Sequence, residues 1–173
     1  MKVAPVTLPP RSAQRVGPEL AARIVGAGET ALLAQPLLGL IASRECPGHV
    51  LIETLDRVPE WVKAGRVVVS GFHSPLEQQV LRSVLRRKGR VVKVLARGMT
   101  EYRPQPEERE PLAASRMLVI TACPPDVRRT TRETALARNR LVLDLATEIA
   151  APHVALGSPL AALLEKSALA GRR

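Results

Sequence analysis

Aromatic residues and cysteines are scarce in this chain of 173 residues. Trp61, Tyr102 and Phe72 are the only aromatic residues, so the core must be aliphatic and a ligand site built on stacked rings is not expected. The two cysteines, Cys46 and Cys123, lie far apart in the sequence. They provide neither a disulfide framework nor a zinc ligand set, and we expect no metal and no cofactor.

Long apolar segments are also missing. No run approaches the length that spans a membrane, and residues 1–15 lack the apolar core of a signal peptide. We therefore expect a cytoplasmic protein without a membrane partner.

Positive charge is abundant instead. The formal net charge is +10, carried mostly by arginine, and such a balance suits a polyanionic partner such as a nucleic acid or a nucleotide. Arginine also keeps proteins soluble, so the charge alone leaves a binding surface and a merely solvated one equally open.

The length fits one domain. Residues 1–18 hold four prolines and little periodicity, which predicts a flexible N-terminal arm followed by a single domain over residues 19–173. Residues 19–33 are a candidate helix, although Gly26 and Gly28 weaken it.

From residue 37 onward, short apolar runs alternate with amphipathic segments. Helices are expected over 50–64, 75–88, 132–147 and 158–168, with Ser74 as the N-cap of the second. Strands are expected at 37–42, 66–70, 90–96, 117–122 and within 148–156. This alternation predicts an α/β fold with three α/β/α layers and a doubly wound, mostly parallel, five-stranded sheet in the order 3-2-1-4-5. The loops after the first and fourth strands would then diverge and open a crevice.

Small residues, hydroxyls and arginines follow the predicted strands. Glycine lets backbone N–H groups approach a phosphate, helix N-termini favour anions, and arginine binds phosphate through two donors. Ordinary turn and cap residues explain any single loop better, but the recurrence at every loop favours a shared phosphate- or nucleotide-binding site. Its candidate residues are Ser43, Arg44, Gly71, His73, Ser74, Arg97, Gly157 and Ser158.

A second cluster follows the fourth strand. Between residues 128 and 140 there are five arginines and a single glutamate. They predict a basic, nucleic-acid-binding face beside the crevice, with a solvated helix face as the alternative. Its members are Arg128, Arg129, Arg132, Arg138, Asn139 and Arg140.

His73 is the one candidate acid or base, because the predicted crevice mouth would make it reachable by a ligand. Glu77 lies one helical turn along and could orient it. We favour the simpler reading, in which His73 donates to a phosphate or to the backbone.

Three motifs in order carry a family resemblance: Ala42-Ser43-Arg44, Ser70-Gly71 and Arg138-Asn139-Arg140. With the stretches 43–48 and 71–77, they resemble the DNA-processing protein A (DprA/Smf) family, and its short standalone members most of all. The resemblance implies a Rossmann-like domain that binds single-stranded DNA and takes part in DNA processing or recombination. It also raises a recombinase partner, which stays open.

Three functions remain in view. The first is a binding module for single-stranded DNA, with largely electrostatic affinity and little base preference. The second is a sensor of a free nucleotide that signals through a partner or a homodimer. The third is an enzyme related to the phosphoribohydrolases, but Leu156-Gly157-Ser158-Pro159-Leu160 lacks the second glycine and the threonine of their signature. No complete catalytic motif is present, which favours binding over catalysis.

Overall fold

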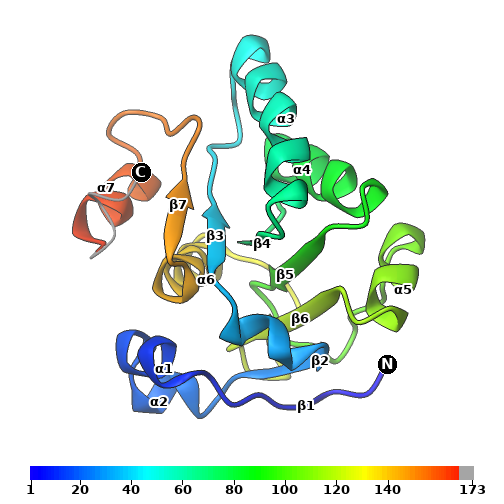
Figure 1. Cartoon of the computed structure of the whole chain (residues 1–173). Coiled ribbons are helices and arrows are strands. Elements are labelled where there is room, and N and C mark those ends of the chain that lie inside the picture. The colour runs from blue at the N-terminus through cyan, green and yellow to red at the C-terminus, as the bar shows by residue number, and fades with distance from the viewer. Residues whose placement is uncertain (168–173) are drawn as a thin grey trace.

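The computed structural model describes residues 1–167 and contains one mixed β-sheet (Figure 1). Its seven strands lie in the order β1-β2-β6-β5-β4-β3-β7. The strands from β6 to β7 are parallel, whereas β1 and β2 are antiparallel to their neighbours. The strands are β1 (Ala4–Pro5), β2 (Val25–Gly28), β3 (Leu37–Leu40), β4 (Val67–Ser70), β5 (Arg90–Val94), β6 (Met117–Thr121) and β7 (Glu148–Ala150).

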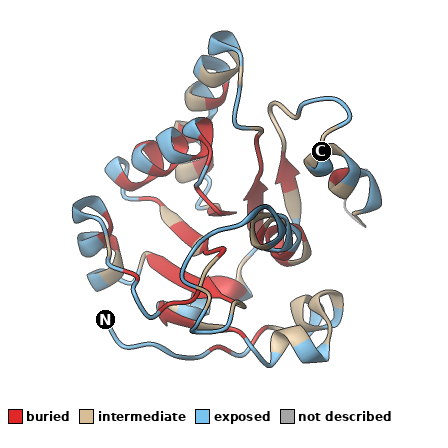
Figure 2. Ribbon diagram, turned by 180° about the vertical axis from the view of Figure 1, so that it is seen from behind, coloured by how far each residue is buried: buried red, intermediate tan, exposed pale blue. Residues whose placement is uncertain are grey.

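Helices cover both faces of the sheet. The helices are α1 (Pro10–Val16), α2 (Pro18–Ala21), the 3-10 helix η1 (Thr30–Ala34), α3 (Gly48–Lys63), α4 (Pro75–Arg86), α5 (Pro106–Ala113), α6 (Arg132–Leu145) and α7 (Pro159–Lys166). One apolar cluster lies between the sheet and α1, α6 and α7, and another lies beneath α3, α4 and α5. Figure 2 shows the buried residues gathered in the strands and on the helix sides turned toward them.

Alternation along the strands explains these two cores. Val67 and Val69 of β4 face the first cluster and Val68 faces the second, because successive side chains of a strand point to opposite faces. The α/β class predicted from the alternating pattern is confirmed.

The predicted strand number and order are wrong. The fourth predicted strand, β6, does not lie beside the first, β3; it pairs with β5, with Val91 opposite Met117. The strand that flanks β3 on its other side is β7. The order therefore reverses between β3 and β7.

The candidate helix over residues 19–33 is also wrong, since α2, β2 and η1 occupy this range. Gly26 and Gly28 lie in β2, where a larger residue would collide with the neighbouring strand. A methyl group on Gly26 would lie 2.5 Å from the Val119 carbonyl oxygen, and one on Gly28 would lie 2.3 Å from that of Met117. The glycines let β2 pair closely with β6.

Residues 1–18 differ from the expected arm, because they contain β1 and α1. Val6 and Leu8 are buried in the first core cluster. The Arg15 guanidinium on α1 donates to the Ala146 carbonyl at the end of α6, at 2.8 Å. The N-terminal segment therefore packs against the sheet and against α6.

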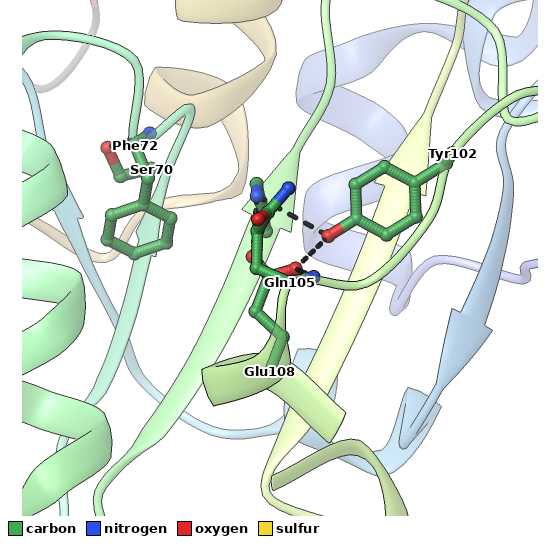
Figure 3. Close-up of polar contacts among 6 residues, drawn as sticks. Ser70, Phe72, Tyr102, Gln105 and Glu108 are labelled. Atoms are coloured by element: carbon green, nitrogen blue, oxygen red, sulfur yellow. Dashed lines mark hydrogen bonds and ion pairs between the residues drawn. The ribbon is translucent and has the colours of Figure 1, made fainter. Parts of the chain in front are cut away.

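A buried polar triad fixes the connection between β5 and α5 (Figure 3). Glu108, only 1% exposed, accepts from the Lys93 ammonium at 2.6 Å and from the Tyr102 hydroxyl at 2.5 Å. It also accepts from the Gln105 N–H at 2.9 Å. Burial first, and then the Glu108 carboxylate, raise the pKa of Tyr102. One carboxylate thus joins a strand, a loop and the first turn of a helix.

Replacing Glu108 with glutamine should lower the free energy of unfolding by about 2–4 kcal/mol, because the largely buried Lys93 ammonium loses its counter-charge and the Tyr102 hydroxyl loses a charged acceptor. Urea denaturation measures the change. Glu107→Gln, at the exposed neighbouring position, is the matched control and should cost less than about 1 kcal/mol. Equal losses in the two variants would contradict a structural role for the triad.

Candidate functional site

A crevice of about 810 Å³ opens at the carboxyl ends of β3 and β4, beside α6 and the start of α7. The strand order reverses at β3, whose following loop lines the crevice. Loop, α4, α6 and α7 residues line it: Ala42, Ser43, Arg44, His73, Ser74, Glu77, Arg132, Glu133, Ala135, Leu136, Arg138, Asn139, Ser158, Pro159 and Leu160.

Glu77 ties the two loops on one side of the crevice together. The residue is 4% exposed, and one oxygen of its carboxylate accepts from the Ala42 N–H at 2.9 Å. The other oxygen accepts from the His73 N–H at 3.0 Å and from the Ser74 N–H at 3.4 Å. Ser74 caps α4 by accepting from the Glu77 N–H, which completes a capping box. The Ser74 cap predicted from the sequence is confirmed.

The backbone N–H groups after β3 and β4 therefore already have an acceptor. They were expected to bind a ligand's phosphate, but Glu77 takes that place. Glu77 was also expected to orient the His73 ring, yet it contacts only the His73 backbone. The exposed His73 side chain makes no hydrogen bond or ion pair with residues 1–167.

The turn between β4 and α4 is held in an uncommon conformation. Phe72 has a φ of 48°, in the left-handed region that costs a residue other than glycine about 1–3 kcal/mol. Its buried ring lies in the second core cluster, and its N–H donates to the Ser70 hydroxyl at 3.0 Å; Figure 3 includes both residues. The buried ring holds the turn so that His73 is placed at the crevice.

Arg138 is the buried cation of the site. It is 7% exposed, and its Nε donates to the Asn139 side-chain oxygen at 2.8 Å. The two Nη groups make no hydrogen bond or ion pair with residues 1–167. No buried side-chain nitrogen or oxygen lacks a partner in this part of the chain. The Nη groups must therefore reach the crevice, where they are free to donate.

Burial outweighs the nearby negative groups, so the pKa of Arg138 lies below its ordinary value. Burial lowers the pKa of its guanidinium, whereas the nearby Glu77 and Cys123 raise it. An arginine retains its proton in proteins despite such effects. The crevice therefore has a poorly hydrated positive charge at its base without a direct ion-pair partner among residues 1–167.

Gly71 makes room for this guanidinium. A methyl carbon placed on Gly71 would lie 2.3 Å from Nη1 and 2.4 Å from Cζ of Arg138. The sequence suggested that Gly71 brings backbone close to a phosphate; the contact is instead with the arginine. Gly71 acts on the crevice through the position of Arg138.

Two serines join the loops on the opposite side of the crevice. The Ser43 hydroxyl oxygen accepts from the Ala155 N–H at 2.8 Å, and the Ser43 N–H donates to the His153 carbonyl at 2.9 Å. Ser158 caps α7 by accepting from the Ala161 N–H at 3.1 Å, and its hydroxyl donates to the Ala155 carbonyl. The loops after β3 and β7 are thus bonded to each other.

The crevice brings together eight of the predicted residues and leaves others outside. Ser43, Arg44, His73, Ser74, Arg132, Arg138, Asn139 and Ser158 line it, whereas Arg97, Gly157, Arg128, Arg129 and Arg140 do not. Their assignment to a binding site stays a prediction. The sequence analysis did not predict the aliphatic residues of the lining. Leu136 follows Arg132 by one helical turn, and this spacing could have placed it on the same side of α6.

The strand order explains why the arginines in the loops after β5 and β6 lie outside the crevice. Because β6 lies beside β5, the loops after these strands pack on each other: the Gly98 N–H donates to the Val127 carbonyl at 2.8 Å, and the Thr121 hydroxyl donates to the Arg97 carbonyl at 2.7 Å. Arg128 pairs with Glu101 at 3.7 Å on this side of the molecule. Strand β5 therefore lies between β6, which precedes the basic loop, and β4 at the edge of the crevice.

Within residues 1–167, no three His, Cys, Asp or Glu side chains gather as metal ligands would. Within the same range, no helix combines the length and the apolarity needed to cross a membrane.

Gly71→Ala should lower the free energy of unfolding by about 1–3 kcal/mol, because the added methyl group displaces a packed guanidinium. In an Arg138→Ala background the same change should cost less than about 1 kcal/mol, which a double-mutant cycle by urea denaturation would reveal. Gly48→Ala is the control, since nothing lies within 4 Å of its added methyl group. Additive losses would show that Gly71 and Arg138 are independent.

The fold is similar to those of two DNA processing proteins of known structure. No curated protein sequence matches the chain. DNA processing protein A (DprA) from Streptococcus pneumoniae aligns with 95% of this chain and 57% of its own, at 18% identity and a TM-score of 0.73. DNA processing protein A from Helicobacter pylori, whose structure concerns its single-stranded DNA binding mode, aligns with 95% of this chain and 75% of its own, at 19% identity and a TM-score of 0.75. The chain thus spans little more than half of the S. pneumoniae protein.

The family assignment rests on the sequence model. The model for DNA recombination-mediator protein A matches residues 10–151, which include β2 to β7. The protein therefore belongs to the DNA recombination-mediator protein A family, the family of DprA.

Proposed function

We propose that the crevice binds phosphate groups of single-stranded DNA, and that the protein acts in DNA processing or recombination. The observation that carries the proposal is the Arg138 guanidinium, which is buried at the base of the crevice with two Nη groups free to donate. A buried cation without a direct partner is costly to maintain, and an anionic ligand offsets that cost.

Further positive charge surrounds this point. Arg44 and Arg132 are exposed in the crevice lining, and neither forms an ion pair with another described residue. The N-terminus of α7 opens at the same place and adds a partial positive charge. The N-terminus of α4 adds less, because the Glu77 carboxylate already occupies it. Side chains rather than backbone turns would therefore hold the phosphates.

Family membership supports a nucleic-acid ligand over other anions. The related H. pylori protein has a described single-stranded DNA binding mode, and the net charge of +10 suits a polyanion. At 19% identity that likeness establishes the fold alone, so the ligand is our proposal. A recombinase partner, a homodimer and a cytoplasmic location stay predictions.

The alternatives receive less support. A free mononucleotide would also fit a crevice of this volume. A binding experiment with both ligands therefore distinguishes a nucleotide sensor from a DNA-binding protein. A phosphoribohydrolase-like enzyme would need an accessible carboxylate near the ligand. Glu77 is buried and engaged by backbone donors, and Glu165, which follows the stretch that resembles the signature, does not line the crevice. Glu133 at the first turn of α6 is the exposed carboxylate of the lining, and it lies outside that stretch.

Arg138→Ala should weaken the binding of a labelled oligonucleotide by about 10- to 150-fold, because charge-assisted hydrogen bonds contribute about 1.5–3 kcal/mol. Fluorescence anisotropy at two salt concentrations measures both the affinity and its salt dependence, which should weaken by about one phosphate contact. Excess mononucleotide that displaces the strand completely would favour the sensor.

Arg140→Ala is the matched control, since it removes the same charge from the same helix outside the crevice. We expect a loss of less than about threefold, as for a peripheral charge. Equal losses in the Arg138 and Arg140 variants would contradict the proposal, because general surface charge would then explain the binding. Circular dichroism confirms that each variant is folded.

A further inference from the structure

The crevice has an aliphatic side that phosphate binding does not explain. Ala135 and Leu136 of α6 and Pro159 and Leu160 of α7 line it; we call these four residues the aliphatic wall. Leu136 is 37% exposed and belongs to neither core cluster. A leucine left in water at a purely ionic site would forgo the stabilisation that apolar burial gives.

The α6 part of the aliphatic wall and the Arg138 guanidinium come from neighbouring positions of the same helix. Leu136 follows Arg132 by four residues and precedes Asn139 by three, so these side chains share one side of the helix. Arg138 extends from the next turn to the base of the crevice. A ligand that meets the guanidinium with a phosphate would therefore present its adjoining part to the wall.

A nucleotide has this combination of a charged and a flat, weakly polar part. The crevice volume of about 810 Å³ lies within the range of sites that enclose a whole small ligand. The three aromatic side chains of the protein do not line the crevice. On the side of Leu136 and Leu160, contact with a base would therefore come from aliphatic dispersion and from the release of water.

We propose that the crevice holds one nucleotide of the strand with its base unstacked and laid on the aliphatic wall, while Arg138 binds the neighbouring phosphate. This inference rests on the proposed function and adds the base as a second contact. A base can reach the wall only when it is unpaired, so the same contact selects single strands over duplexes. Aliphatic side chains read no base edge, so the contact does not depend on base identity.

The test compares three DNA ligands of equal length. They are oligothymidylate, the same strand with abasic sites throughout, and the duplex of oligothymidylate with its complementary strand. The full chain should bind oligothymidylate about tenfold more tightly than the abasic strand, and the duplex no better than the abasic strand. Leu136→Ala should weaken oligothymidylate binding about fivefold, as for the loss of one buried aliphatic contact, and leave abasic binding unchanged. Anisotropy titrations measure all of these affinities.

Ile52→Ala is the control, because Ile52 is 61% exposed on α3 and lies outside the crevice. It should change neither affinity. Equal binding of the oligothymidylate and abasic strands, or a parallel loss of both in Leu136→Ala, would overturn the base contact and leave the phosphate site intact. If none of the three ligands binds in a salt-sensitive way, the proposed function itself is overturned.

Discussion

The crevice depends on a single buried carboxylate. Glu77, at the first turn of α4, gathers N–H groups from the loop after β3 and from the turn after β4. A charge removed from water needs such donors, and three backbone groups supply them. By fixing the two loops, the carboxylate also fixes Gly71, over which the Arg138 guanidinium packs. The positive charge at the base of the crevice is therefore positioned, through these two loops, by a buried negative charge.

In this arrangement the backbone N–H donors at the strand ends and the side chains available to a ligand have different partners. Backbone turns at strand ends commonly bind the anion directly through their N–H groups. Here the turns satisfy an internal acceptor, and the side chains of Arg44, Arg132 and Arg138 remain for an external one. Binding through side chains has longer reach and stronger salt dependence. It suits a flexible polyanion better than a small ligand of fixed shape.

Local sequence signals predicted the elements well where one pattern decided the outcome. The row of Leu76, Val80 and Val84 behind a serine cap could form only an amphipathic helix, and α4 matches it. The short strand β2 escaped notice because its glycines resemble turn residues, and their purpose depends on the carbonyl groups of β6. Strand order depends on pairing between distant segments, which periodicity along the chain does not encode. The position of the arginines after β6 followed the wrong order for the same reason.

The candidate site shows the same division. The rule that functional residues follow parallel strands brought Ser43, Arg44 and Ser74 to one place. The burial of Arg138 and the engagement of Glu77 depend on contacts between α6, α4 and the loop after β3, which no single segment predicts.

The two edges of the sheet affect how the protein meets other molecules. Both edge strands, β1 with two residues and β7 with three, are very short, and β1 contains Pro5. Few free backbone groups are therefore available to a strand of another molecule, which guards this apolar, valine-rich sheet against edge-to-edge aggregation.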